Sequence, residues 1–252
     1  MVQIISIANQ KGGVGKTTTS VNLSAALANI GKNVLLVDCD SQANATTGMG
    51  IDKPSLKYSL YQGLIGSTEI DNIIYPTVLS KLKIIPATMD LIGFEFEIVS
   101  EKDREKKLRQ LLDPVKDQFD YIILDCPPAL GLLTLNAFTA SDAVLIPLQS
   151  EFYALEGLGQ LLDTIKRVKS SFNSKLKIKG ILLTMYDGRT NLSQQVVEDA
   201  RKYFKGMVFK TKISRNVKLS EAPSYGLPII LYDKNSPGSK NYMAFTREFL
   251  KR

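Results

Sequence analysis

Residues 11–18 read Lys-Gly-Gly-Val-Gly-Lys-Thr-Thr, a glycine-rich stretch that carries two lysines. An apolar run at residues 4–8 precedes it, and a helical pattern of apolar residues follows at 17–30. A strand, a glycine-rich loop and a helix in this order are the setting of a phosphate-binding loop, because glycines let several backbone N–H groups converge on one anion. The stretch therefore predicts an α/β protein that binds phosphate at the start of a helix.

The loop departs from the pattern G-x-x-x-x-G-K-[ST]. Gln10 stands where the first glycine belongs, and an additional lysine stands at position 11. Lys16 is still expected to reach the β- and γ-phosphates of a nucleotide, and the Thr17 hydroxyl to hold Mg²⁺. We interpret the loop as a variant with a mechanism of its own.

Buried strands and amphipathic helices alternate along the rest of the chain. This alternation predicts an α/β fold with a mostly parallel twisted sheet and helices on both faces. With no linker or repeat in the pattern, we expect one domain over residues 1–252. The expected strands are 34–37, 82–85, 121–124, 144–147 and 178–183, and the expected helices are 17–30, 89–100, 104–112, 131–140, 155–170, 191–204 and 238–250.

Acidic residues follow two of these strands. Asp38 and Asp40 end the strand at 34–37, and Asp125 ends the strand at 121–124. Ligands of parallel sheets bind beyond the carboxyl ends of the strands, so these acids should face the same crevice as Lys16. We expect Asp125 to bind Mg²⁺ through a water molecule and Asp38 to lie near the hydration shell of the metal.

The composition narrows the possible chemistry. The chain has 252 residues, a net charge of +7, two cysteines and no histidine. The absence of histidine excludes a histidine general base and most zinc sites. The positive charge permits nucleic acid or an anionic membrane as a partner without choosing between them. No apolar run is long enough to span a bilayer, so we expect a cytoplasmic protein.

Several longer stretches beyond the loop also match the sequence of a known family, namely residues 44–48, 127–130, 151–157, 183–190 and 215–224. Because of these stretches and residues 11–18, the chain resembles the ParA/Soj chromosome-partitioning branch of the deviant Walker A ATPases. The resemblance extends over nearly the whole chain.

The resemblance implies ATP and Mg²⁺ as cofactors and an ATP-dependent homodimer. In that family the lysine matching Lys11 reaches the phosphates of the partner subunit's ATP, and Gly12 has no side chain because that nucleotide approaches it. Asp40 matches the residue that orients the attacking water. Lys11, Lys16 and Asp40 are thus the expected catalytic residues, and Thr17, Asp38 and Asp125 the expected metal site. The expected nucleotide contacts are Lys11, Gly12, Gly13, Val14, Gly15, Lys16, Thr17, Thr18, Ser214 and Asn216.

The family also implies non-specific binding of double-stranded DNA by the ATP dimer. Arg189 and Lys218 match positions linked to DNA, and Arg215 is a further candidate. A ParB/Spo0J-like centromere-binding partner would stimulate slow hydrolysis of ATP, and the protein would associate with the nucleoid.

Two other functional classes share the loop. A MinD-like positioning ATPase would bind membranes through the last helix, where Tyr242, Phe245, Phe249 and Leu250 recur at helical spacing. Such a stripe more often packs on the core of its own domain, so we expect no membrane partner. A relative of the nitrogenase iron protein would need cysteines at a dimer face, whereas Cys39 and Cys126 lie within the strand ends.

Overall fold

The computed structural model describes residues 2–151 and 158–252. Its sheet has seven strands in the order β3-β4-β2-β5-β1-β6-β7, and every neighbouring pair is parallel except β3 and β4. The strands are β1 (Gln3–Ile7), β2 (Val34–Asp38), β3 (Tyr75–Pro76), β4 (Leu82–Ile85), β5 (Tyr121–Asp125), β6 (Ala143–Gln149) and β7 (Lys177–Thr184). The predicted α/β fold with a mostly parallel sheet is confirmed.

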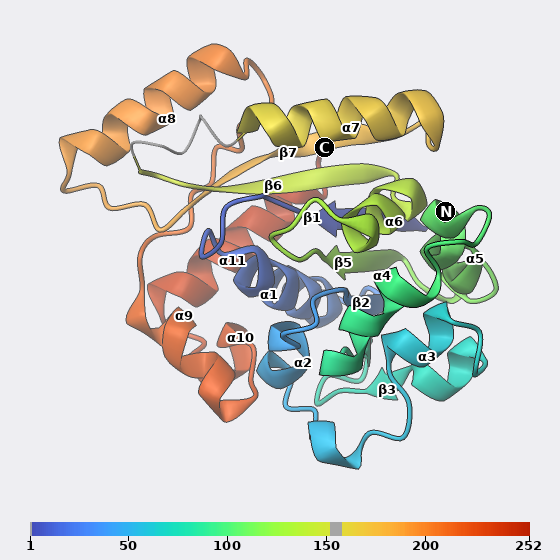
Figure 1. Ribbon diagram of the computed structural model, residues 1–252. Coiled ribbons are helices and arrows are strands. Elements are labelled where there is room, and N and C mark those ends of the chain that lie inside the picture. The colour runs from blue at the N-terminus through green and yellow to red at the C-terminus, as the bar shows by residue number, and fades with distance from the viewer. Residues whose placement is uncertain (1, 152–157) are drawn as a thin grey trace.

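Alternate residues of each central strand enter two separate cores, one on each face of the sheet. Figure 1 shows helices on both sides of this sheet. In β2, for example, Leu35 faces one core and Leu36 the other. This is the pattern of strands covered by helices on both sides, and it explains their continuous apolar runs. The helices are α1 (Lys16–Asn29), α2 (Asn44–Gly48), α3 (Leu60–Leu64), α4 (Gly93–Glu97), α5 (Lys107–Leu112), α6 (Leu132–Ala140), α7 (Leu158–Ser171), α8 (Asn191–Tyr203), α9 (Val217–Glu221), α10 (Ile229–Tyr232) and α11 (Pro237–Phe249).

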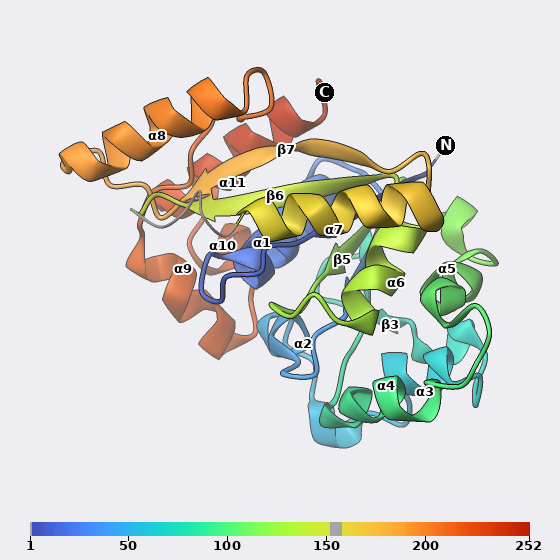
Figure 2. The same ribbon diagram turned by 45° about the horizontal axis from the view of Figure 1, so that its top comes forward.

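The two cores are built by different helices. Helices α3 to α8 supply the first core, whereas α1, α2, α9, α10 and α11 supply the second. Figure 2 shows α3, α4 and α5 grouped at one end of the molecule, away from α8.

Two predicted helices are interrupted. The segment 89–100 begins as a 3₁₀ turn at Met89–Ile92 and is α-helical only over α4, and the segment 104–112 begins as a 3₁₀ turn at Arg104–Lys106. A glycine at position 93 weakens the helix where the first of these changes occurs. The expected start of the helix at Leu155, and all of the matched stretch 151–157 except Glu151, lie outside the described residues.

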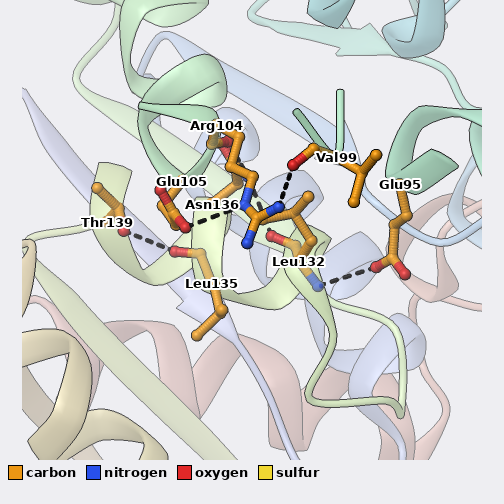
Figure 3. A network of polar contacts seen from close by, with 8 residues as sticks. All are labelled: Glu95, Val99, Arg104, Glu105, Leu132, Leu135, Asn136 and Thr139. Carbon is orange, nitrogen blue, oxygen red and sulfur yellow. Dashed lines mark hydrogen bonds and ion pairs between the residues drawn. The ribbon is translucent and has the colours of Figure 1, made fainter. Parts of the chain in front are cut away.

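Polar contacts fasten this interrupted region to α6 (Figure 3). The buried Asn136 side chain donates to the carbonyls of Arg104 (2.8 Å) and Leu132 (3.0 Å) and accepts the Leu108 N–H (3.1 Å). A Glu95 carboxylate oxygen accepts the Leu132 N–H at 2.9 Å, so it caps the first turn of α6.

Helix α11 packs on the sheet through its aromatic stripe. Tyr242, Phe245 and Phe249 are buried, and only Leu250 at the end of the stripe is exposed. The Phe245 ring lies edge-on to Phe209, with centroids 4.9 Å apart. The stripe therefore belongs to the core, and no helix among the described residues is both long and apolar enough to cross a bilayer.

We predict that Phe245→Ala lowers the free energy of unfolding by about 3–5 kcal/mol, because it empties a large buried site. The matched control is Phe96→Ala, at a ring that is 77% exposed, which should change stability by less than about 0.5 kcal/mol. Urea unfolding followed by circular dichroism measures both. Equal midpoints for the two variants would contradict the packing of α11 on the sheet.

Candidate nucleotide site

Two adjoining pockets open at the carboxyl edge of the sheet. The first, about 470 Å³, is lined by the glycine-rich loop, the start of α1, Asp40 and Pro128. The second, about 400 Å³, is lined by residues 213–217 and Tyr242. Both pockets share Gly15, Thr18, Met185 and Pro223 as lining residues, so they form one continuous depression.

The loop backbone has the conformation that its glycines permit. Gly13 and Gly15 adopt φ values of +74° and +87°, which residues other than glycine rarely adopt. The Thr184 hydroxyl donates to the Val14 carbonyl at 2.8 Å and holds the loop against β7. By contrast, a Cβ atom at Gly12 would have no neighbour within 4 Å among the described residues. None of the residues that the structure describes therefore requires glycine at position 12.

Lys16 lies inside the site. Its side chain starts in the first turn of α1, is only 7% exposed, and its Nζ donates to the Lys11 carbonyl at 3.1 Å. Burial lowers the pKa of this ammonium, whereas the nearby carboxylates of Asp125 and Asp40 raise it. The ammonium group can therefore bind a phosphate at the N-terminus of α1, where the free backbone N–H groups and the helix dipole also favour an anion.

The two strand-end acids lie side by side and fully buried. Asp38 and Asp125 are direct partners in the β2–β5 register. Both carboxylate oxygens of Asp38 accept hydrogen bonds from the protein itself. Oδ2 accepts the Thr46 N–H (2.8 Å) and hydroxyl (2.7 Å), and Oδ1 accepts the Asp40 N–H at 3.2 Å. This geometry gives Asp38 a structural role in shaping the loop after β2, and its predicted place near the metal stays a prediction.

Asp125 is only half satisfied. Its Oδ1 accepts the Ser20 hydroxyl at 2.7 Å, but its buried Oδ2 has no hydrogen-bond partner among the described residues. Burial, together with the negative charge of Asp38, raises the pKa of Asp125 to about 8. A buried carboxylate oxygen without a partner, beside the Thr17 hydroxyl, fits a hydrated Mg²⁺ ion, since that ion is held by hard oxygens and keeps most of its waters.

Asp40 lies at the border of the same pocket. It is mostly buried, and its Oδ1 accepts the Gln42 N–H at 3.0 Å. The other carboxylate oxygen accepts no hydrogen bond from the described residues, so the side chain can accept a proton or orient a polar group in the pocket.

Lys11 and Lys16 have opposite surroundings. The Lys11 ammonium lies outside the pocket, about half exposed, and pairs with the Glu151 carboxylate at 3.2 Å. Its backbone N–H donates to Asn9 Oδ1 at 3.0 Å. Lys11 is therefore not aimed at the pocket of its own subunit.

Ser214 and Asn216, which we predicted to contact the base, both line the second pocket. The Asn216 side-chain oxygen is buried without a hydrogen-bond partner in the described structure. Such an oxygen can accept from the amino group of a base, which would recover the cost of burying it. Arg215 lines the same pocket and is exposed.

The three predicted DNA contacts are exposed, and two of them are already paired with carboxylates. Arg189 binds Asp187 through two nitrogens, at 2.6 and 2.9 Å, and Lys218 binds Glu221 at 2.8 Å. Arg215 forms no ion pair with the described residues. Any DNA phosphate at Arg189 or Lys218 has to compete with a neighbouring carboxylate.

Several contributors to the site carry no motif of their own. Ser20 fixes Asp125, Thr46 fixes Asp38, Thr184 and Asn9 fix the loop, and Glu151 fixes Lys11. Asn9 and Ser20 lie near the loop, and Thr46, Glu151 and Thr184 lie in the stretches 44–48, 151–157 and 183–190 that carry the family resemblance. No pattern assigned a role to any of the five, because the roles depend on contacts made by folding.

The two cysteines are buried free thiols. Burial raises the pKa of Cys126 to about 12 and that of Cys39 well above its usual range. They are small core residues next to the site, an arrangement that does not suit a cluster shared with a second subunit.

We predict that Asp125→Asn stabilises the protein increasingly as the pH rises from about 4 to 8, in buffer without magnesium and nucleotide. The folded pKa of Asp125 is raised, so folding opposes its ionisation over this range and the asparagine removes that cost, by about 1–3 kcal/mol at pH 8. Urea unfolding at several pH values measures the difference. The control, Asp52→Asn at an exposed site, should show none. A gain independent of pH would contradict the assignment.

Comparisons with known proteins agree with this geometry. A family model, AAA_31, described as an AAA domain, matches residues 2–178. The sporulation initiation inhibitor protein Soj of Bacillus subtilis is 56% identical over 98% of both chains. The chromosome partitioning protein ParA of Myxococcus xanthus is 54% identical over 99% of this chain and 88% of its own.

A solved structure is similar over the whole chain. The crystal structure of cobyrinic acid a,c-diamide synthase from Mycobacterium smegmatis with bound ADP and magnesium is 36% identical, has a TM-score of 0.89, and is covered over 95% of its length by 100% of this chain. The fold, the variant loop and the full-length similarity agree. The chain therefore belongs to the ParA/Soj family of chromosome-partitioning ATPases.

Proposed function

We propose that the protein is an ATP-dependent switch for chromosome or plasmid partitioning. ATP binding closes a homodimer that binds DNA, and slow hydrolysis, stimulated by a partner, opens it again. One observation carries the proposal: Lys16, which lines the first pocket at the N-terminus of α1, and the half-satisfied Asp125, which accepts a hydrogen bond from Ser20 of the same helix, are both buried. Burying such groups is costly unless a ligand compensates them.

Different residues of the chain would contact the phosphates, the base and the metal of the nucleotide complex. The N–H groups of Gly12, Gly13, Val14 and Gly15 and the Lys16 ammonium would bind the phosphates, Thr18 the α-phosphate, and Ser214 and Asn216 the base. Thr17 and Asp125 would hold Mg²⁺, with Asp38 behind them. When bound, the metal neutralises charge on the transferred phosphate. The Mycobacterium smegmatis relative, whose structure contains ADP and magnesium, supports this assignment.

The dimer would use Lys11 in trans. The ammonium lies outside its own pocket and is held by Glu151 through a half-exposed ion pair, which is worth at most about 1 kcal/mol. It can therefore leave Glu151 at little cost and bind a phosphate in a partner subunit. The open space around Gly12 would admit that nucleotide.

Hydrolysis is expected to be slow. Asp40 lines the first pocket and would orient the attacking water. No arginine reaches the first pocket from the described residues. A slow ATPase of this kind serves as a timer, with a second protein setting its rate.

The expected cargo is DNA, and the expected place is the cytoplasm, at the nucleoid. Arg189 and Arg215 lie on exposed loops, Lys218 is an exposed residue of α9, and Arg215 also lines the second pocket. A ParB/Spo0J-like protein would stimulate turnover, as the family membership implies. The MinD-like alternative loses its main support, because the aromatic stripe of α11 is buried.

We predict that Lys16→Ala abolishes ATP binding, since the buried ammonium is the main phosphate ligand. Lys11→Ala should keep ATP binding but lose the dimer. Asp40→Ala should bind ATP and dimerise without hydrolysing it. Fluorescent-nucleotide binding and size-exclusion chromatography with ATP separate the three. If the Asp40→Ala protein remains strictly monomeric at saturating ATP, the result contradicts the proposed closed dimer.

We predict that Arg189→Glu with Lys218→Glu still dimerises with ATP but binds DNA at least about tenfold more weakly, with a reduced salt dependence. The matched control is Lys53→Glu with Lys83→Glu, two exposed lysines that lie in the 3₁₀ turn Lys53–Ser55 and in β4. Gel retardation at two salt concentrations measures the effect. Unchanged retardation by the first variant would remove these residues from the DNA surface.

A further inference from the structure

A separate depression, about 550 Å³, opens at the edge of the sheet opposite the nucleotide site, where β1, β6 and β7 begin. Its volume lies in the range of small-molecule sites. Asp142 is the one acidic side chain among the described residues that line it, and its Oδ2 already accepts the Ile4 N–H at 2.8 Å. We call this depression the basic pocket, because its lining includes five cations, namely Lys169, Lys175, Lys177, Lys179 and Arg252.

The four lysines of the basic pocket have no acidic partner. They come from α7, from the loop that follows it and from β7, and none of them forms an ion pair with a described residue. Cations that share one concave site repel one another, most strongly where water is partly excluded. The pocket therefore carries a positive charge that a bound anion would compensate.

A local irregularity of β7 places Lys179 at this pocket. Val144 of β6 pairs with Ile178, but the next residue of β6, Leu145, pairs with Gly180. Lys179 is thus the extra residue of a β-bulge, an irregularity that re-aims a side chain and recurs beside active sites. In a regular ladder Lys179 would lie opposite Leu145, which is fully buried. The bulge keeps the lysine at the edge of the core.

The ammonium of Lys179 is half-buried beside a second cation. Its Nζ lies 4.6 Å from the centre of the Phe249 ring and donates to Gln3 Oε1 at 3.4 Å. Burial and the positive charge of Arg252 lower the pKa of Lys179. Arg252 is held in place by Glu248, at 3.5 Å. Two like charges are therefore kept close together at the edge of the core, an arrangement that favours an anion.

We propose that the basic pocket is a second anion site, independent of the nucleotide site, and that it binds a small molecule with two or more phosphate groups. A phosphate group carries up to two negative charges and three strong acceptor oxygens. Two such groups match the charge of four lysines, whereas a single one leaves half of that charge uncompensated. The phosphates would come from a short inorganic chain or from a phosphorylated nucleoside.

Two larger anions fit the basic pocket less well. A neighbouring depression shares Val2 with it and is lined by Asp117 and Asp120, so a DNA duplex that extended in this direction would meet two carboxylates. An anionic membrane would also need apolar side chains to insert. None of the large apolar side chains that are exposed in the described structure lines the basic pocket. Both become outcomes of the test.

The test uses the full chain with Lys16→Ala, so that the nucleotide site does not bind the probes. The pocket variant adds Lys175→Gln with Lys177→Gln. The matched control adds Lys53→Gln with Lys83→Gln, which removes the same charge from exposed lysines elsewhere. Isothermal titration measures the binding of tripolyphosphate, adenosine 3′,5′-bisphosphate and orthophosphate, and circular dichroism checks that each variant is folded.

The control is expected to bind tripolyphosphate as tightly as its parent, and the pocket variant at least about tenfold more weakly, because charged hydrogen bonds are lost. Tighter binding of tripolyphosphate than of the bisphosphate supports an inorganic chain as the ligand, and the reverse order supports a phosphorylated nucleoside. Equal affinities of pocket variant and control, or equal affinities of orthophosphate and tripolyphosphate, would overturn the proposal.

A second variant gives a measurement without any ligand. In phosphate-free buffer, Lys179→Met should raise the midpoint of urea unfolding, because it removes a half-buried charge beside Arg252. The same substitution, added to Lys16→Ala, should weaken the binding of tripolyphosphate. A lowered midpoint or unchanged binding would contradict the role of Lys179 in the site.

DNA and membranes are tested with Lys16 intact. The substitutions Lys175→Gln and Lys177→Gln should leave gel retardation of DNA with ATP, and sedimentation with phosphatidylglycerol vesicles, equal to those of the matched control. A selective loss of either would overturn the proposal in favour of that larger anion. Fluorescent-ATP binding by the same proteins reports separately on the proposed function.

Discussion

Three ionisable side chains are buried at one edge of the sheet, and the arrangement of the site depends on how each of them is compensated. Asp38 is satisfied by Thr46 and by its own loop, and Lys16 by the Lys11 carbonyl. Asp125 keeps one carboxylate oxygen without a partner. Burying an ionisable group without a partner raises the free energy of the folded state. The imbalance at Asp125 is what a magnesium–nucleotide complex would correct.

The same edge explains why the two lysines of the loop act differently. Lys16 starts α1 and is enclosed by the strands, whereas Lys11 precedes the tight turn and points to solvent and Glu151. A single pocket cannot receive both groups in this conformation. In the proposed dimer, a second subunit would give Lys11 a phosphate to bind, and the weak Glu151 pair would allow the exchange. Nucleotide binding and association of the subunits would then be coupled through the charge of Lys11.

The buried parallel strands could be predicted from the sequence because runs such as Val34–Val37 are apolar on both faces. The loop, Asp125 and the second pocket at Ser214 and Asn216 also followed from sequence, through motif and resemblance. The short helices α2, α9 and α10 could not be predicted, since four or five residues are too few to show a helical period. The contact of Lys11 with Glu151 joins residues 140 positions apart, and no local pattern encodes it. Likewise, the exposed side of the segment 89–99 could not be distinguished from its buried side before folding placed it.

The central claim is that the unpartnered oxygen of Asp125 belongs to a magnesium site shared with a nucleotide. Isothermal titration of ADP into wild type and Asp125→Asn, with and without Mg²⁺, tests it most directly. The account predicts that Mg²⁺ strengthens binding at least about tenfold in the wild type and hardly at all in the variant, as for the loss of a group that orients metal-bound water. An equal effect of Mg²⁺ on both proteins would contradict the account.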